Sequence, residues 1–137
     1  MGNKEMILII DDEINIQLTL SRILTRAGFQ VMTLMNDQES IMKALTNNID
    51  LIIIDFDVEV NKGECSLSEI RNKLIDIPLI VLTHHPSEEI YNCSHKFEHC
   101  ELIIKPINPE TILEVVIRML AITGNPKPQP HLINTIS

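Results

Sequence analysis

The stretch MILIIDDE, residues 6–13, joins five apolar residues directly to three acidic ones. A short, wholly apolar run is typical of a strand that is covered on both faces, as the strands of parallel sheets are. Similar runs occur at residues 51–54, 79–82 and 102–104, whereas residues 29–34 mix polar with apolar side chains. The pattern predicts five strands, with residues 29–34 as a less buried strand at an edge of the sheet.

Amphipathic segments alternate with these strands. Residues 13–27 carry apolar side chains at helical spacing, Gly28 follows as a stop, and the Asn-Pro-Glu sequence at 108–110 is a helix start signal. Further helical patterns begin near residues 36, 64 and 87, the last of them weak. The alternation predicts right-handed crossovers and a parallel sheet with helices on both faces. In the first helix the inward-facing residues are predicted to be Ile16, Leu20, Ile23, Leu24 and Ala27.

The length and composition indicate one globular domain. The chain has 137 residues, of which 45% are hydrophobic, and this is enough for a core. We expect the domain to span residues 1–123, and residues 124–137, which include three prolines between 126 and 130, to form an extended tail or linker. A net charge of -8 argues against direct binding to nucleic acid or to an anionic membrane.

The sequence also favours a cytoplasmic location. No apolar run approaches the roughly 20 residues needed to cross a bilayer, and the opening residues MGNKEMILII lack the features of a secretory leader. The three cysteines, Cys65, Cys93 and Cys100, form no Cys-x-x-Cys pair. We therefore expect free thiols in a reducing compartment.

Chemically active side chains follow four of the five predicted strands. In open α/β sheets, ligands bind outside the carboxyl ends of the strands, where the winding reverses. A strand order of 2-1-3-4-5, that of flavodoxin-like doubly wound folds, would make these four strand ends neighbours and leave the second strand at the edge. The residues concerned are Asp11 and Asp12, Asp55, Thr83 with His84, and Lys105.

This set of side chains suits a divalent cation and a phosphoryl group. Two carboxylates at 4 Å repel by about 4 kcal/mol at an effective dielectric constant of 20, and a cation relieves the repulsion. Oxygen ligands favour Mg2+, which keeps open positions for phosphate oxygens. Lys105 supplies a second positive charge and Thr83 a hydroxyl donor, so that one carboxylate can act as a nucleophile on phosphorus.

The segments LIIDDE, DLIIID, LIVLT and LIIKP resemble the strand ends of the receiver domain of two-component response regulators, and the likeness runs from about residue 5 to residue 121. The resemblance implies a signalling domain rather than an enzyme, with at most self-phosphorylation from small donors and self-dephosphorylation. It implies that a sensor histidine kinase or phosphotransfer protein is the phosphodonor. The output would be a downstream protein or a homodimer formed through the face from the fourth to the fifth helix.

The resemblance also assigns roles to individual residues. Asp55 would be the phosphoacceptor, with Mg2+ or Mn2+ bound directly by Asp12, largely through water by Asp11, and by the backbone carbonyl of Asp57. Thr83 would be the switch hydroxyl and Lys105 the phosphate partner.

Three positions depart from the family pattern: Leu102, His84, and Glu59, which replaces a proline often found four residues after the acceptor. Leu102 stands where an aromatic residue is usual, and leucine cannot reproduce an aromatic hydroxyl that moves between exposed and buried positions. His84 stands where a small residue is usual, and its imidazole could narrow access to Asp55 or slow an attacking water. We therefore expect an atypical switch readout, strict metal dependence and slow phosphorylation.

Other interpretations of the same residues stay open. The chain could be a pseudo-receiver that serves for docking or dimerisation without phosphorylation. The segment LIIIDFDVEV resembles the first motif of haloacid dehalogenase-like phosphatases, although no Asp-Asp pair follows Asp57. Asp12 could simply cap a helix. The cysteines and histidines of CSHKFEHC could bind zinc, although their spacing fits no finger pattern well: Cys93, His95, His99 and Cys100.

Overall fold

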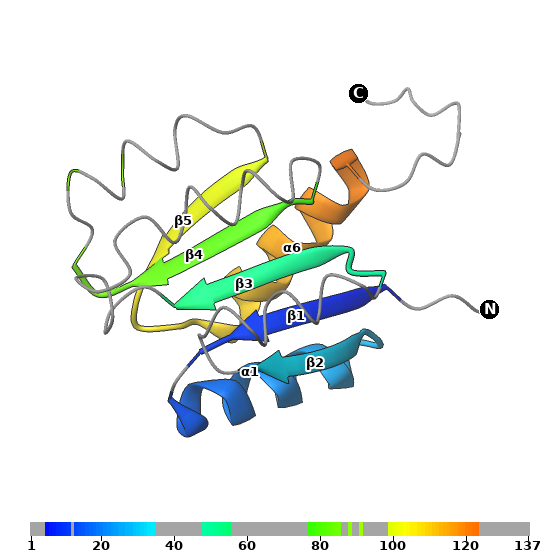
Figure 1. Cartoon of the computed structure of the whole chain (residues 1–137), viewed down its shortest axis with the longest axis horizontal. Coiled ribbons are helices and arrows are strands. Elements are labelled where there is room, and N and C mark those ends of the chain that lie inside the picture. Colours follow the sequence, from blue (N-terminus) through cyan, green and yellow to red (C-terminus); the bar gives the residue numbers. More distant parts are fainter. Residues whose placement is uncertain are drawn as a thin grey trace.

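The sheet has five parallel strands in the order β2-β1-β3-β4-β5 (Figure 1). The computed structural model describes residues 5–11, 13–34, 48–55, 77–85, 88, 91 and 99–123. The predicted strand order is thus confirmed. The strands are β1 (Met6–Ile10), β2 (Gln30–Leu34), β3 (Leu51–Asp55), β4 (Leu79–Thr83) and β5 (Cys100–Ile104).

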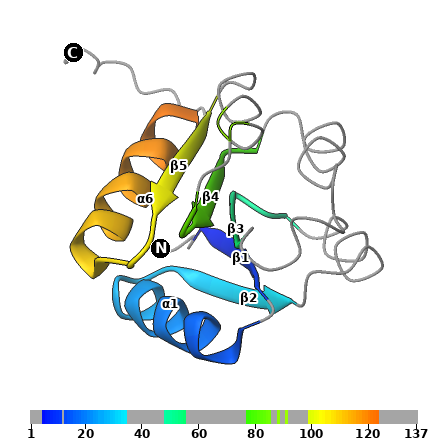
Figure 2. The same cartoon turned by 90° about the vertical axis from the view of Figure 1, so that its left-hand side faces the viewer.

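The three central strands carry the core. Side chains alternate across a strand, so Ile7 and Ile9 face one side of the sheet while Leu8 and Ile10 face the other. On the first side, helices α1 (Ile14–Arg26) and α6 (Pro109–Thr123) pack on the strands, as Figure 2 shows. The apolar side chains that α1 and α6 bury there are Leu20, Leu24, Ile112, Val115, Val116 and Met119.

The edge strands differ from the centre, and one prediction needs correction. β2 is only half-buried, as its mixed sequence predicts. The apolar run at residues 102–104 predicts a strand covered on both faces, yet the first four residues of β5 are half-buried and the last, Ile104, is 48% exposed. The cause is topological, because β5 is the last strand in the order and pairs only with β4.

Both described helices have identifiable ends. At the start of α6, Asn108 Oδ1 accepts hydrogen bonds from the backbone N–H groups of Glu110 (2.9 Å) and Thr111 (3.2 Å), as the start signal predicts. At the end of α1, the chain turns through Gly28, whose φ of 101° is a conformation that L side chains rarely adopt. Ala27 lies in this turn and is exposed, so its predicted inward position is wrong.

The other predicted helices, near 36–48, 64–74 and 87–97, lie largely outside the described residues, so helices on the second face of the sheet stay a prediction there. Within the part of the chain that the structure describes, no helix has the length and apolar character needed to cross a membrane.

Candidate functional site

Four side chains from four strand ends form the site. Asp11 follows β1, Asp55 ends β3, Thr83 ends β4 and Lys105 follows β5. Among the residues that the structure describes, these four are the only polar or charged ones that are buried. Since buried polar groups destabilise a fold unless they are partnered, their concentration at one edge of the sheet marks a site built for binding or chemistry.

The register of the sheet brings the four residues together. Ile10 pairs with Ile54 and Asp55 pairs with Leu82, so Asp11 and Thr83 each lie one residue beyond a pair with β3. The backbone N–H of Lys105 donates to the carbonyl of Thr83 at 2.9 Å, which continues the β4–β5 ladder to the edge. The predicted convergence of Asp11, Asp55 and Lys105 is therefore observed.

Asp11 is almost completely buried. Its backbone N–H donates to the carbonyl of Leu34 (3.1 Å), and its Oδ1 accepts from the backbone N–H of Glu13 (2.8 Å). Its Oδ2 is buried and accepts no hydrogen bond. A buried carboxylate oxygen without a donor is well suited to bind a cation.

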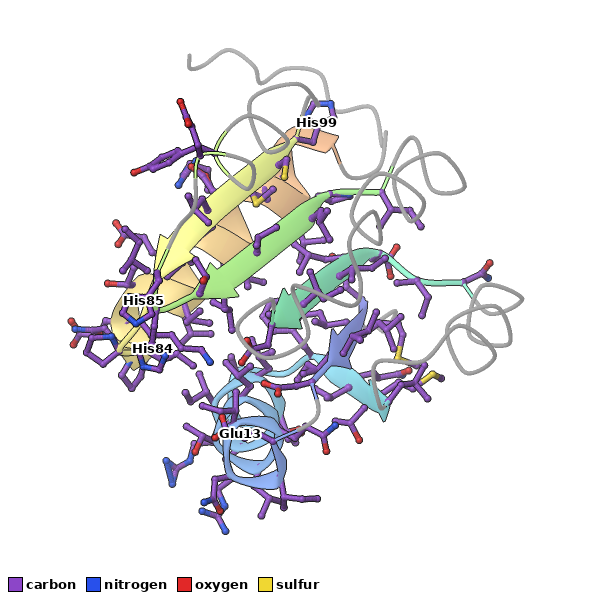
Figure 3. All side chains as sticks on the ribbon, turned by 60° about the vertical axis from the view of Figure 1, so that its left-hand side comes forward. Glu13, His84, His85 and His99 are labelled. Atoms are coloured by element: carbon purple, nitrogen blue, oxygen red, sulfur yellow. The ribbon has the colours of Figure 1, made fainter. Side chains whose placement is uncertain are left out.

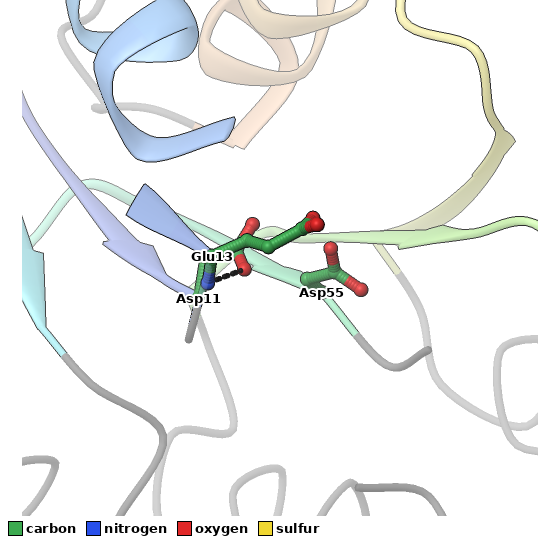
Figure 4. A group of neighbouring side chains, drawn as sticks. All are labelled: Asp11, Glu13 and Asp55. Atoms are coloured by element: carbon green, nitrogen blue, oxygen red, sulfur yellow. Dashed lines mark hydrogen bonds between the residues drawn. The ribbon is translucent and has the colours of Figure 1, made fainter. Parts of the chain in front are cut away.

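Three carboxylates cluster at this edge of the sheet. Asp11, Glu13 and Asp55 each place a carboxylate oxygen within 4.8 Å of the other two, and Figure 4 shows the Glu13 side chain extending toward Asp55. Glu13 is exposed, and its place in the sequence predicts only the start of a helix. The one sequence signal that could have identified it is its place two residues after Asp11, on the turn that leaves β1.

The electrostatics of the site favour a bound positive charge. Burial raises the pKa of the Asp11 carboxyl from its ordinary 3.8 to about 7, and the charge of Asp55 acts in the same direction. The N–H of Glu13 and the charge of Lys105 lower this pKa. At neutral pH the burial of an ionised Asp11 is therefore costly, and either a proton or a cation relieves it.

Lys105 supplies the positive charge that is built into the site. Its Nζ forms a buried ion pair with Asp55 Oδ2. Among the described residues, three carboxylates and one ammonium leave a formal charge of -2 when all are ionised, and this excess of negative charge favours a divalent cation. The donor set consists of carboxylate oxygens, which Mg2+ and Mn2+ prefer, so the residues present fit such an ion.

The remaining predicted site residues lie as follows. Thr83 is buried, and its Oγ1 accepts a hydrogen bond from the backbone N–H of His85 at 3.2 Å. His84 and His85 are exposed beyond the end of β4, with ring centroids 6.1 Å apart (Figure 3). Leu102 is half-buried and packs against the core on the face opposite α1 and α6. Asp12 and Asp57 lie outside the described residues, so their roles stay predictions.

The zinc interpretation gains no support from the described residues. His99 and Cys100 lie at the amino end of β5, and Figure 3 shows His99 at the opposite end of the sheet from His84 and His85. Cys93 and His95 lie outside the described residues.

Comparison with known proteins agrees with the geometry. The family model of the response regulator receiver domain matches residues 7–117. The chain is 35% identical over 133 residues to the probable transcriptional regulator ycf27 of Cyanidium caldarium. The match covers 91% of this chain and 51% of that protein. It is 32% identical over 120 residues to the transcriptional regulatory protein ResD of Bacillus subtilis, with coverages of 88% and 48%.

Solved structures give the same result. The chemotaxis protein CheY4 of Vibrio cholerae superposes with a TM-score of 0.75 at 29% identity, covering 86% of this chain and 100% of that one. A response regulator from Thermotoga maritima gives 0.73 at 25% identity, with coverages of 87% and 99%. This chain belongs to the response regulator receiver domain family, the signalling domains of two-component systems. It spans about half the length of these curated relatives.

Proposed function

We propose that this chain is a phosphoacceptor domain, in which Asp55 takes a phosphoryl group from a phosphohistidine of a sensor histidine kinase or phosphotransfer protein. The observation that carries the proposal is the position of Asp55. Its buried carboxylate lies within 4.8 Å of a carboxylate oxygen of Asp11 and of Glu13, and it forms an ion pair with the ammonium group of Lys105. An oxygen of Asp55 forms the new bond to phosphorus, and the P–N bond breaks with its electron pair passing to the imidazole nitrogen.

A divalent cation completes the site. Asp11 and Asp55 would hold Mg2+ or Mn2+ together with Asp12 and the backbone carbonyl of Asp57, and the buried Oδ2 of Asp11 supports this assignment. When bound, the ion neutralises the charge of the carboxylates and of the phosphoryl oxygens.

The other residues act on the phosphoryl group once it is attached. The Lys105 ammonium, which contacts Asp55 Oδ2, can instead pair with a phosphoryl oxygen. Thr83 ends the neighbouring strand and offers its hydroxyl as a donor to another phosphoryl oxygen. Leu102 packs in the core, where it has no polar group to exchange with solvent, so we propose a switch readout that does not depend on a moving aromatic side chain.

The partners follow from the family. ResD and ycf27 are named as transcriptional regulators, and each is about twice as long as the region matched. We propose that this domain controls a downstream protein or output segment in the cytoplasm, and that it does not bind nucleic acid itself. The net charge of -8 supports the last point.

Intact-mass measurement after incubation with acetyl phosphate and Mg2+ tests the proposal. We expect one phosphoryl adduct, which is absent with EDTA and absent in Asp55→Asn. A matched control, Glu114→Gln, changes an exposed carboxylate on α6 and should keep the adduct. If wild-type protein forms no adduct with acetyl phosphate or with a phosphorylated kinase, the pseudo-receiver alternative replaces this proposal.

A further inference from the structure

Asp11 is fixed by its main chain as well as by its carboxylate. Its N–H donates to Leu34 O, its Oδ1 accepts from Glu13 N–H, and its carbonyl accepts from the side-chain amide of Gln17 at 2.6 Å. Three of its four polar groups therefore have protein partners. The fourth, Oδ2, is buried and accepts no hydrogen bond, and the Asp11 carboxylate places one of its oxygens within 4.8 Å of a carboxylate oxygen of Asp55 and of Glu13. The orientation of this oxygen depends on how firmly the turn after β1 is held.

The side chain of Gln17, on helix α1, holds this turn through hydrogen bonds to the backbone. It lies one turn into α1, is half-buried, and its Nε2 donates both to Asp11 O (2.6 Å) and to Leu34 O at the end of β2 (3.1 Å). The same Leu34 carbonyl accepts the N–H of Asp11. One NH2 group thus links the start of α1 to the carboxyl ends of two neighbouring strands.

The contact requires a donor with two hydrogens. Both partners of Nε2 are carbonyl oxygens, which only accept hydrogen bonds. If residue 17 were Glu, its carboxylate oxygens would face two carbonyl oxygens and could not donate to either. If residue 17 were Leu, the Asp11 carbonyl would lose this hydrogen-bond donor. The identity of residue 17 therefore matters, not only its volume.

We propose that Gln17 is a positioning residue for the cation site, which holds the Asp11 main chain so that Oδ2 points at the cation position. The inference rests on the proposed function, because it concerns the cation that phosphorylation requires. Gln17 acts through Asp11, since its Nε2 donates to the backbone carbonyls of Asp11 and Leu34 and not to the carboxylates of the cluster. It follows that the cation affinity, and not only the stability, depends on a side chain outside the acidic cluster.

The test measures the dissociation constant of Mn2+ by calorimetry for the full chain and for the variants Gln17→Leu and Gln17→Glu. The loss of one or two hydrogen bonds predicts an affinity about three- to tenfold weaker for Gln17→Leu, and at least as weak for Gln17→Glu. Gln30→Leu and Gln30→Glu make the same chemical changes at an exposed position at the start of β2, and they should leave the affinity unchanged. Gln17→Arg, which restores donors, should recover most of the loss.

Amide exchange of Glu13 in EDTA gives a second measurement that needs no cation. Its N–H is protected by Asp11 Oδ1, and this protection should fall in Gln17→Leu but not in Gln30→Leu. If Gln17 has only a structural role, its variants will unfold at lower urea while the folded protein binds Mn2+ within twofold of wild type, and the proposal is then wrong. If wild type itself does not bind Mn2+, the proposed function fails, and the exchange measurement alone decides whether Gln17 positions Asp11.

Discussion

Replacing Asp11 with Asn should make the stability of the cation-free protein less dependent on pH. The carboxyl of Asp11 has an ordinary pKa of 3.8 and a pKa of about 7 in the folded protein. Between these two values the folded protein keeps a proton on Asp11 that the unfolded chain has lost. The folded state thus binds more protons, and its stability falls as the pH rises.

The pKa change sets the size of the effect. One pKa unit corresponds to about 1.4 kcal/mol, so the shift from 3.8 to about 7 is equivalent to about 4 kcal/mol in total. The contribution is fully present below pH 3.8 and is lost by about pH 7. Between pH 5 and pH 7 the loss from this one group is about 2 kcal/mol, a substantial part of the stability of a typical domain.

The assay is urea unfolding in EDTA at pH 5, 6, 7 and 8 for wild type and Asp11→Asn. Asn keeps an oxygen that can accept the Glu13 N–H but carries no charge. We expect Asp11→Asn to become more stable relative to wild type by about 2 kcal/mol as the pH rises from 5 to 7. Glu114→Gln, which removes an exposed carboxylate, is the matched control. If the difference between Asp11→Asn and wild type is the same at pH 5 and pH 8, the reasoning about Asp11 is refuted.

Three further predictions concern other residues. Lys105→Met leaves the buried carboxylate of Asp55 without its ion-pair partner. The free energy of unfolding in EDTA at pH 8 should therefore fall by about 3–5 kcal/mol, and a fall below about 1 kcal/mol would contradict a buried ion pair. Glu13→Gln should weaken Mn2+ binding in calorimetry, but by less than Asp11→Asn, because Glu13 is exposed; an equal loss would mean that Glu13 is a direct ligand. Asn108→Ala removes the cap of α6 and should lower the free energy of unfolding by about 1 kcal/mol without changing the Mn2+ affinity. Unchanged stability would show that the cap contributes nothing.

The sequence was sufficient for the strand order and for the position of the site. Solid apolar runs marked the strands, and the reactive residues at their ends were informative only because the ends of parallel strands meet at one edge. The apolar run at the end of β5 looks like that of a central strand, so the sequence does not reveal that β5 is partly exposed. This exposure arises because β5 is the last strand in the sheet and has one neighbouring strand.

Two contributors to the site could not be found from the sequence. Gln17 looked like an ordinary residue on the polar side of an amphipathic helix, and its role depends on where the carbonyl of Leu34 lies after folding. Glu13 looked like a helix start, and its role depends on the direction in which the chain leaves β1. Both roles are tertiary, because they arise from atoms whose relative position is set by the packing of α1 and β2 on β1.

The charge of the site would link stability to the proposed cation binding and phosphorylation. Lys105 pairs with Asp55, and the three clustered carboxylates still leave an excess of negative charge when all are ionised. This excess destabilises the fold and would repel an incoming phosphoryl group. A divalent cation would relieve both effects at one place. The gain in stability and the gain in the rate of phosphorylation should therefore rise over the same range of Mg2+ concentration. Widely separated midpoints would mean that the cation needed for phosphorylation binds at a different place from the cation that stabilises the fold.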